Sequence, residues 1–407
     1  MRLRPDLTLL PLDNEFVVFS EAAQCLIGLN ASASFVFHAL REGMAISDIA
    51  PAMSTGGFAP PDEAERWVTK TLEEFALLGM LAEGPGPKAL PMGTVVQDLG
   101  CGDSRFTRVL PHTEFLPALE RTYQLLDTRM LIRFGALQQA EVVDTAIGHL
   151  AADEGAKPTV VMDLPLSITR GYWRSDIFLD GKPFRYVPRL SMLGPIIKAC
   201  LWRAAVSAYD FLFYVHAGVV GTDDGCVLLP AAAGSGKSSL TAALVHSGFR
   251  YYSDEVALIQ RATYRVPPVP LAICVKSTGW HVMARYYPDI EALRIHGRED
   301  GKLVRYIAPP RGAAQYSPAR VSHIVFPHYQ EGASTALKAV TRTEALRRVM
   351  DECLGLRQRL SSMNVEELLR WIAEISCYDL TFSSLDQAAL LVRQMVSDRK
   401  SNHSNGS

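Results

Sequence analysis

Apolar positions follow two different periods along this chain, and the periods predict where helices and strands lie. Between residues 61 and 78, apolar side chains recur at spacings of three and four, which predicts an amphipathic helix. Pro61 suits the first turn of that helix, and Gly79 suits its C-terminal cap. Short apolar runs typical of strands precede it at residues 16–20 and 26–29, and a short helical run lies at residues 35–40.

Strand-like segments dominate after residue 120. They occupy residues 130–134, 160–162 and 178–179, and a helical pattern follows at residues 190–208. Residues 211–220 form a nearly continuous apolar run, and the turn sequence GTDDG separates it from the apolar segment CVLLP. We therefore expect residues 211–230 to form two paired core strands.

Clusters of Gly and Pro divide the chain into units. The segment EGPGPKALPMG at residues 83–93 interrupts every periodic pattern and predicts a linker. We assign a small N-terminal unit to residues 1–82, a linker and connecting segment to 83–120, an α/β unit to 121–396 and a disordered tail to 397–407. Capping patterns at residues 364–367 and 384–387 predict two helices near the end of the α/β unit.

Composition narrows the classes of function. The 407 residues are 48% hydrophobic, which is enough for full-sized cores, and their formal net charge is only -2. So small a charge gives no uniform field that would attract nucleic acid or an anionic membrane, and we expect neither as a partner. Seven scattered cysteines without a CxxC pair, and the lack of an apolar run of about 18 residues, predict a cytoplasmic protein with reduced thiols. The oligomeric state stays open, with a homo-oligomer as one alternative.

The sequence AAAGSGKSS at residues 231–239 carries the clearest chemistry. A strand that leads into a Gly-rich turn and then a helix surrounds phosphate oxygens with backbone N–H groups. Here an apolar strand precedes the turn, and a helical pattern follows it up to residue 247. The residues expected to bind a nucleotide cofactor, ATP, and its Mg²⁺ are Ala231, Gly234, Ser235, Gly236, Lys237, Ser238 and Ser239.

Within this loop the side chains have different expected roles. Lys237 would reach the β- and γ-phosphates as a point charge, and the Ser238 hydroxyl would hold Mg²⁺. Ser239 also suits the plain surface of a helix. Ala231 stands where the usual phosphate-loop pattern has Gly, and a positive φ there would cost Ala on the order of 1 kcal/mol. The alternative to phosphate binding is a Gly-rich turn with a solvated lysine.

Phosphoryl transfer to a hydroxyl also needs a group that orients the acceptor and removes its proton. Asp254 and Glu255 stand in the strand-like stretch FRYYSDEVALI, where adjacent carboxylates are costly without a cationic partner such as Mg²⁺. His216 lies inside the apolar run before the phosphate loop. A lone histidine on a strand is more often a core residue, and the two carboxylates could lie in an exposed loop, so both interpretations stay open.

The order and spacing of these residues resemble HPr kinase/phosphorylase and its relatives, above all the HPr-kinase-related branch. The likeness extends over residues 121–396 and includes FYVHAGVV, LLPAAAGSGKSSLTAALVHSGFRYYSDEVALI, APPR and IVFPHY. It implies an α/β P-loop kinase domain of HPr-kinase type. Asp254 would then act as the catalytic base with help from His216, while Lys237 and Ser238 would hold phosphate and metal.

Two features bear on the kind of activity. Glu255 stands where relatives usually have a second Asp, and it is a candidate metal ligand with Ser238 and Asp254. The Glu-containing signature of the bifunctional enzymes is not recognisable after the acidic pair, where Lys276 occupies the region, so kinase activity is favoured over phosphorylase activity. Arg311 in IAPPRG is a further catalytic candidate, because its charge could neutralise the transition state.

Residues 1–82 resemble a PqqD-like peptide-binding domain. The likeness rests on RPDLTLLPLDNEFVVFS, CLIGLN, SFVFHAL and FALLGML. It implies a small winged-helix-like α+β fold that captures the leader of a ribosomally made precursor peptide by adding it as a strand to a sheet edge. Because these residues contain no cluster of nucleophile, base or metal ligands, a plain packing or docking unit is the alternative.

One motif competes with these assignments. The segment VVQDLGCGDSRF at residues 95–106 is similar to the first loop of methyltransferases that use S-adenosylmethionine. However, Pro111 and Pro117 interrupt the helix that should follow, and no ribose-binding acid is clear about 20 residues further on. A methyltransferase is therefore the weakest alternative.

The residues and resemblances together predict an ATP- and Mg²⁺-dependent kinase. It would transfer the γ-phosphoryl group to a Ser or Thr hydroxyl of a peptide or protein that residues 1–82 bind in part, with a ribosomal precursor peptide as one such substrate. A nucleotide-binding regulatory module without catalysis is a different class of answer, and Ala231 and Glu255 keep it open. A kinase for a small metabolite or sugar is a third, and it predicts activity without the N-terminal unit.

Overall fold

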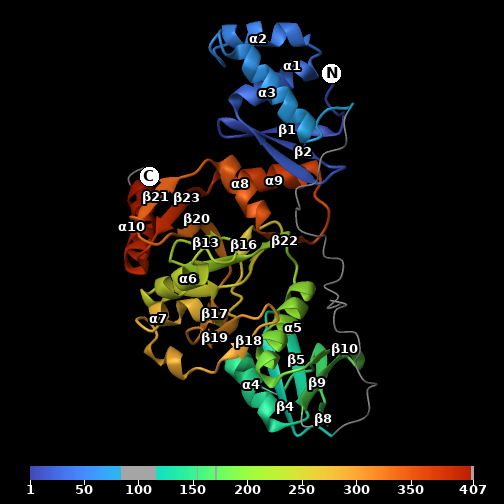
Figure 1. The fold of residues 1–407 in the computed structure, drawn as a ribbon, viewed down its shortest axis with the longest axis vertical. Coiled ribbons are helices and arrows are strands. Elements are labelled where there is room, and N and C mark those ends of the chain that lie inside the picture. Colours follow the sequence, from blue (N-terminus) through green and yellow to red (C-terminus); the bar gives the residue numbers. More distant parts are fainter. Residues whose placement is uncertain (84–115, 154, 170–171, 405–407) are drawn as a thin grey trace.

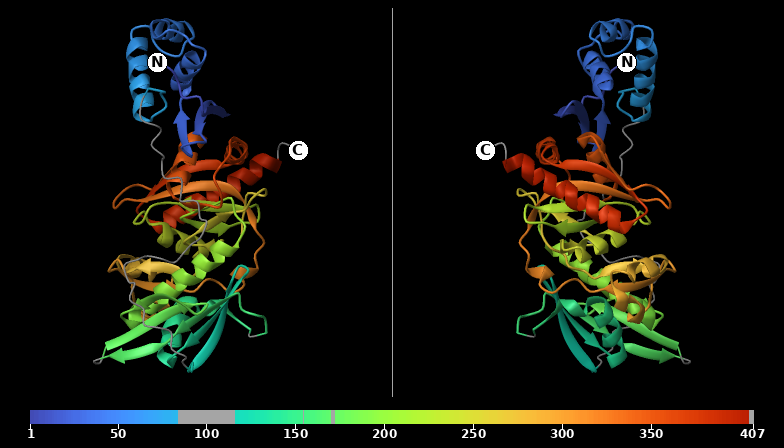
Figure 2. Two further views of the ribbon diagram at one scale, coloured as in Figure 1. Left: turned by 90° about the vertical axis from the view of Figure 1, so that its right-hand side faces the viewer. Right: turned by 90° about the vertical axis from the view of Figure 1, so that its left-hand side faces the viewer.

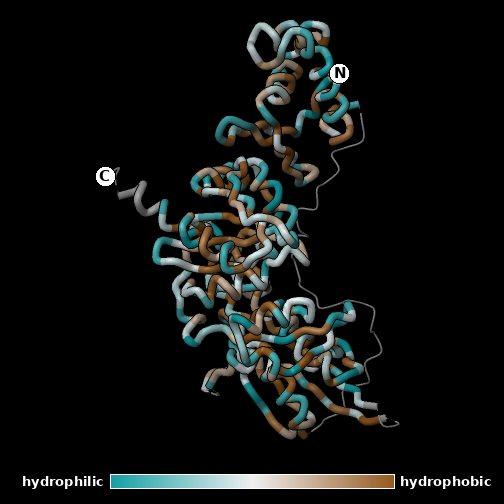
Figure 3. The backbone as a smooth tube through the Cα atoms, turned by 60° about the vertical axis from the view of Figure 1, so that its left-hand side comes forward, coloured by the Kyte–Doolittle hydropathy of each residue, from teal (hydrophilic) through white to brown (hydrophobic). Residues whose placement is uncertain are grey.

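The computed structural model describes residues 1–83, 116–153, 155–169 and 172–404. Over these ranges the protein is elongated, with the N-terminal unit at one end and the strand-rich segment around β4 to β10 at the other (Figures 1 and 2). Hydrophobic stretches of backbone run through both of these ends and through the region between them (Figure 3). Most of the expected linker, and the whole DLGCG segment, lie outside the described residues.

The N-terminal unit combines an antiparallel sheet with three helices in the described residues. The sheet has the order β1-β2-β3, formed by β1 (Leu7–Leu12), β2 (Glu15–Ser20) and β3 (Cys25–Leu29). The helices are α1 (Ala31–Arg41), α2 (Ile46–Thr55) and α3 (Ala64–Leu77). The Asn30 side chain caps α1 by accepting from Ala33 N at 2.8 Å. Gly79 follows α3 with a φ of 70°, as expected, whereas Pro61 lies in the turn before that helix.

This N-terminal sheet is covered on both faces. Because side chains alternate along a strand, one set, which includes Val18 and Ile27, packs against α1, α2 and α3. The other set, which includes Leu10, Val17 and Phe19, belongs to a core shared with α8 (Arg342–Asp351) and α9 (Ser362–Ala373). The N-terminal unit is therefore packed directly onto the C-terminal helices, as Figure 1 shows.

The strand-rich segment forms a mixed sheet with the order β10-β9-β7-β5-β4-β6, and β8 pairs with β9. Its strands are β4 (Leu119–Leu125), β5 (Thr128–Phe134), β6 (Ala151–Ala152), β7 (Val160–Leu164), β8 (Leu166–Thr169), β9 (Tyr172–Leu179) and β10 (Lys182–Val187). Helices α4 (Leu137–Ile147) and α5 (Leu193–Ala208) share a core with this sheet. Asp180 and Gly181 both have positive φ, 48° and 75°, and form a tight turn between β9 and β10.

The central region holds three further sheets, one of seven strands and two of three strands each. One has the order β15-β11-β22, one has the order β14-β12-β13-β20-β23-β21 with β16 on β20, and one has the order β17-β19-β18. The strands are β11 (Phe213–Val215), β12 (Ala217–Gly221), β13 (Cys226–Pro230), β14 (Arg250–Ser253), β15 (Ala257–Ile259), β16 (Arg265–Val266), β17 (Ile273–Lys276), β18 (His296–Gly297), β19 (Leu303–Ile307), β20 (Ala319–Tyr329), β21 (Ala336–Ala339), β22 (Cys353–Leu356) and β23 (Ser376–Phe382). The helices are α6 (Lys237–His246), α7 (Trp280–Met283) and α10 (Leu385–Ser404).

Two predicted boundaries differ in this region. Helix α9 is capped by Ser361, whose side chain accepts from Asn364 N, so the helix starts earlier than the expected cap at residues 364–367. Helix α10 continues to Ser404, so its backbone is helical through part of the segment expected to be a tail.

The expected continuous strand over residues 211–220 is wrong. The chain forms β11 and β12 there, and these strands belong to different sheets, with His216 between them. Strand β12 does pair antiparallel with β13, as predicted, from Ala217 opposite Pro230 to Gly221 opposite Cys226. An unbroken apolar run cannot reveal such a break, because both strands are buried on both faces and favour the same residue types.

Candidate active site

Two neighbouring strand breaks create the candidate site. Strand β12 pairs with β14 and β11 pairs with β15, so both chain segments cross from one sheet to the other together. The crossings are His216 on one segment and residues 254–256 on the other, with Val215 opposite Ala257 and Val219 opposite Ser253. The sequence suggests that Asp254 and Glu255 lie within a strand, but the structure places them between two strands. The alternative of an exposed loop does not hold for Asp254, because its side chain is buried.

The turn between β13 and α6 has the shape that a phosphate loop needs. Gly234 and Gly236 adopt positive φ, 100° and 86°. A Cβ atom on Gly236 would lie 2.9 Å from Phe382 Cζ and 3.1 Å from Tyr329 Cβ, so only glycine fits there without a shift. Strands β20 and β23 thus hold the turn from behind. Ala231 is not among the described residues with positive φ, and the strain expected there does not arise.

Lys237 and Asp254 are buried side chains of opposite charge, each with one polar atom that lacks a hydrogen-bond partner among the described residues. These atoms are Lys237 Nζ and Asp254 Oδ1. Burial lowers the pKa of Lys237, against the opposing charges of Asp254 and Glu255. Burial also raises the pKa of Asp254 to about 6, although Lys237 and Lys198 oppose the shift. Buried polar atoms without partners fit a site that binds a polar ligand.

The second oxygen of Asp254 is held in place. Its Oδ2 atom accepts a hydrogen bond from the backbone N–H of Cys274 at 3.2 Å. Cys274 belongs to β17, so a strand of a third sheet positions this carboxylate. One oxygen is fixed and the other is free, which is the arrangement expected of a group that acts on a ligand.

His216 lies beside this pair and faces Glu352. Its Nδ1 atom is 3.5 Å from Glu352 Oε2, and its backbone N–H donates to Glu352 O at 2.9 Å. Burial, reinforced by the charge of Lys237, lowers the pKa of His216 to about 4, so the imidazole is neutral near pH 7. Glu352 follows α8 directly, which ties that helix to the site.

Glu255 is engaged by Lys198 of α5, whose ammonium group pairs with Glu255 Oε2. Burial pushes the pKa of Glu255 upward, but the charge and hydrogen bond of Lys198 outweigh burial, and the net pKa is lowered. The Lys198 Nζ atom also lies 5.2 Å from the centre of the Tyr306 ring. The lysine therefore supplies the cationic partner that two adjacent carboxylates require.

The other predicted site residues are placed differently. Ser238 and Ser239 lie half-buried in the first turn of α6, beside Lys237. Arg311 is exposed on the loop after β19, and within the described residues no hydrogen bond or ion pair joins it to Lys237 or Asp254. The structure thus places Lys237 within electrostatic reach of His216, Asp254 and Glu255, and leaves Arg311 outside that group.

Sequence reasoning missed Lys198, Cys274 and Glu352. A signal for Lys198 exists, because it is a lysine on the apolar face of the helical pattern LGPIIKACLW, where a charge needs a partner. Glu352 carries no such signal, because it follows an ordinary charged helix. Cys274 acts through its backbone, which any residue could supply.

A magnesium ion would have to be held by few protein atoms. In the described part of the chain, no group of three or more His, Cys, Asp and Glu side chains is arranged to bind a metal. Ser238 Oγ and the free oxygen of Asp254 are the available ligands, which suits Mg²⁺ because it keeps waters and phosphate oxygens in its shell. Glu255 fits less well, since Lys198 already neutralises it.

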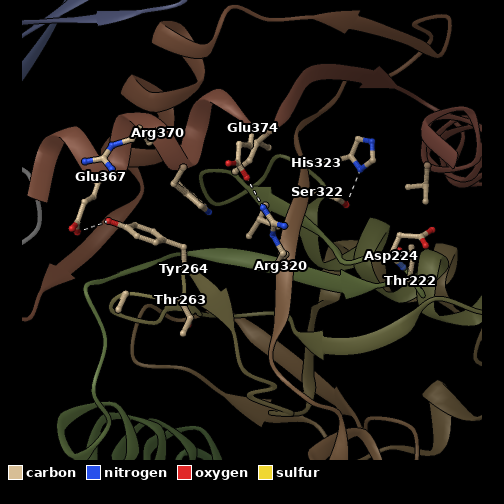
Figure 4. A pocket seen from close by; sticks show the side chains of 15 residues that line it. Thr222, Asp224, Thr263, Tyr264, Arg320, Ser322, His323, Glu367, Arg370 and Glu374 are labelled. Carbon is tan, nitrogen blue, oxygen red and sulfur yellow. Dashed lines mark hydrogen bonds and ion pairs between the residues drawn. The ribbon is translucent and has the colours of Figure 1, made fainter. Parts of the chain in front are cut away.

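A cavity of about 1210 Å³ lies at the opposite end of β13. Figure 4 shows side chains that line this cavity. It is lined by the turn before β13, the start of β20 and the helix α9. Three of its charged side chains are already engaged, since Arg320 pairs with Glu374 and the Tyr264 hydroxyl donates to Glu367 at 3.2 Å. None of the predicted site residues, all of which the structure describes, lines it, so its size does not make it the candidate site.

Comparison with known proteins adds little to this geometry. No family model matches the chain, and no curated protein matches it. One similar solved structure is TbiB1 in complex with the TbiA(beta) leader peptide, at 21% identity over 21% of this chain and 99% of that one, with a TM-score of 0.19. Another is the Hpr(Ser) kinase/phosphatase from Coxiella burnetii, at 13% identity over 47% of this chain and 98% of that one, with a TM-score of 0.24. Such scores support no argument about activity. Among the described helices, none combines the length and apolar character needed to cross a membrane.

Proposed function

We propose that this chain is an ATP-dependent kinase that transfers the γ-phosphoryl group to a Ser or Thr hydroxyl of a peptide or protein. The observation that carries the proposal is the pair of buried, oppositely charged atoms without partners, Lys237 Nζ and Asp254 Oδ1, beside a turn with two left-handed glycines. Backbone amides and an ammonium group suit phosphate oxygens, and a buried carboxylate oxygen suits an acceptor hydroxyl or Mg²⁺.

Each residue has a role in this proposal. Lys237 and the amides of residues 234–236 would hold the β- and γ-phosphates, and Ser238 would hold Mg²⁺ together with water and phosphate oxygens, which leaves the free oxygen of Asp254 to the acceptor. Asp254 would accept the hydroxyl proton while the acceptor oxygen bonds to the γ-phosphorus and the bridging oxygen leaves with ADP. Its pKa of about 6 leaves it mostly ionised at pH 7 and still basic enough for that step. His216, neutral and within electrostatic reach of Lys237, would orient the acceptor.

The N-terminal unit would hold a remote part of the substrate. Both faces of its sheet are covered, so a peptide strand can add only at an edge. Strand β1 contains Pro11, which has no N–H to donate and weakens that edge. Strand β3 pairs only with β2 in the described residues, and it is the edge we assign to the peptide.

Label transfer from γ-labelled ATP tests the catalytic proposal. Purified full-length chain would be incubated with peptides encoded beside its gene, and we expect labelled Ser or Thr. Asp254→Asn should lower the transfer rate by about 10²–10⁴-fold, the usual contribution of a general base, while a non-hydrolysable ATP analogue still binds. Lys237→Met should weaken binding of the analogue itself. Transfer that survives Asp254→Asn unchanged would refute the assignment of the base.

Hydrogen exchange tests the docking part separately. When a precursor peptide is added and binds, hydrogen exchange should slow at the amides of residues 25–29 in β3. Exchange at residues 7–12 in β1 should not change. The matched comparison lies within one sheet, so a general tightening of the unit would affect both strands. Protection of β1 alone, or of neither strand by a peptide that is phosphorylated, would contradict docking at β3.

One observation favours a second candidate function, a nucleotide-binding module without catalysis. Glu255 is neutralised by Lys198, so one of the two carboxylates available to a metal is already engaged. This candidate predicts tight binding of ATP, no transfer to any peptide and no effect of Asp254→Asn on a cellular readout. Any label transfer that depends on Asp254 would exclude it.

A further inference from the structure

A cavity of about 310 Å³ lies next to the catalytic carboxylates, on the side of Glu255 that faces α5. Two neighbours of Asp254 form part of the wall of this cavity. Glu255 follows Asp254 in the chain, and the backbone N–H of Cys274 donates a hydrogen bond to the Asp254 carboxylate. The remaining wall comes from α5, from the turn after β18 and from β10 and β19. Its volume is at the small end of the range for ligand sites, so it admits one or two side chains of an extended segment and no folded surface.

The charges of this cavity do not balance. Among the described residues that line it there are four cations and three carboxylates. Each carboxylate is matched by an ion pair: Glu255 with Lys198, Glu299 with Arg185, and Asp300 with Arg298 at 3.3 Å. The fourth cation is Arg203.

Arg203 lies near a ring and has no carboxylate partner among the described residues. Its guanidinium carbon lies 5.9 Å from the centre of the Trp202 ring, and no ion pair involves it within the described residues. The side chain is exposed on α5, five residues after Lys198. A planar guanidinium group near a ring, with no carboxylate partner among the described residues, is suited to bind a carboxylate or phosphate.

We propose that this cavity is the acceptor site and selects a hydroxyl whose neighbouring group carries a negative charge. The inference rests on the proposed kinase function. The acceptor hydroxyl enters past Glu255 to reach Asp254, and the adjacent anionic group is bound by Arg203. An acidic side chain next to the acceptor serine is the source that we assign to this anion, because the cavity admits a short extended segment.

Binding of two matched peptides tests this selectivity in the full-length protein. One blocked peptide carries serine followed by glutamate, and the other carries glutamine in its place, so that the two differ by a single charge. Trp202 lines the cavity, and its fluorescence reports binding when the wild type is compared with Trp202→Phe. We expect the glutamate peptide to bind at least about tenfold more tightly, as for one charge-assisted hydrogen bond.

Arginine variants show whether Arg203 is responsible. Arg203→Gln should bring the two peptides within about threefold of each other. Arg285→Gln, which changes an arginine that pairs with Asp386 outside this cavity, should keep the tenfold preference. Equal binding of the two peptides to the wild type, or no binding of either, would overturn the proposal, as would a preference that survives Arg203→Gln.

Label transfer from ATP separates this inference from the function on which it rests. Transfer to both peptides at equal efficiency would refute the selective cavity and leave the kinase standing. Selective binding of the glutamate peptide with no transfer to it, or to any other peptide, would refute the kinase.

Discussion

Replacement of Gly236 by Ala tests whether the turn before α6 is held in one shape by the strands behind it. The φ of Gly236 is 86°, which costs an L-residue about 1–2 kcal/mol. The added Cβ would also meet Phe382 Cζ at 2.9 Å and Tyr329 Cβ at 3.1 Å. The phenylalanine ring can give way at its far end, but the tyrosine Cβ is fixed to the backbone, so overpacking adds about 1–3 kcal/mol.

Gly234 provides the matched control. Its φ is also positive, 100°, but a Cβ there meets nothing within 4 Å. Gly234→Ala should therefore cost only the backbone conformation, about 1–2 kcal/mol, and Gly236→Ala should cost about 2–5 kcal/mol in total. Urea unfolding of both variants beside the wild type measures the difference. Equal losses of stability in the two variants would show that Tyr329 and Phe382 do not confine the turn, and the reasoning would fail.

Three further predictions concern side chains around the site. Lys198→Met should destabilise the protein by about 3 kcal/mol in urea unfolding, because it leaves Glu255 without its cationic partner. This value is the lower end for a broken buried pair, since the Glu255 side chain is 33% exposed, and adding Glu255→Gln should recover part of the loss. Ala231→Gly should lower the free energy of unfolding by about 0.4–1 kcal/mol in the same assay. Ala231 does not have a positive φ, so glycine relieves no strain there and only increases the conformational freedom of the unfolded chain. A gain in stability would contradict the φ observed at Ala231. His296 is fully buried and its pKa is lowered to about 4, first by burial and then by Arg294, so protonation favours unfolding. Stability should be complete above about pH 6.5 and fall by up to about 3 kcal/mol as the pH approaches 4, and His296→Gln should flatten that part of the urea midpoint profile.

Local features of the site are predictable from the sequence because they depend on neighbours in the chain. Apolar residues predict the strand before Lys237, and Gly234 and Gly236 predict the turn. Gly248, whose φ is 104°, lies just beyond the end of the helix that follows. Strand β1 and helix α2 escaped prediction because Pro11 and Pro51 interrupt their patterns, although an edge strand and a short helix both tolerate proline here.

The contacts that complete the site are not predictable in this way. Lys198 pairs with a carboxylate 57 positions away, and Glu352 reaches His216 from a helix that lies far along the chain. The break at His216 arises because its neighbours pair with different strands, and an apolar run is equally compatible with one long strand. Which residues meet is decided by tertiary pairing, which leaves no periodic trace in a single sequence.

The two-sided burial of the N-terminal sheet has a consequence for any attempt to dissect this protein. The boundary near residue 82 divides the chain but does not divide the hydrophobic core, because Leu10, Val17 and Phe19 share that core with Leu346 and Val349 of α8. Truncation at this point would expose apolar side chains of α8 to solvent. Glu352, which contacts the imidazole of His216, follows this helix directly. Loss of activity in a truncated protein would therefore not show that residues 1–82 bind the substrate. Substitution of single residues at the edges of the N-terminal sheet would test this role instead.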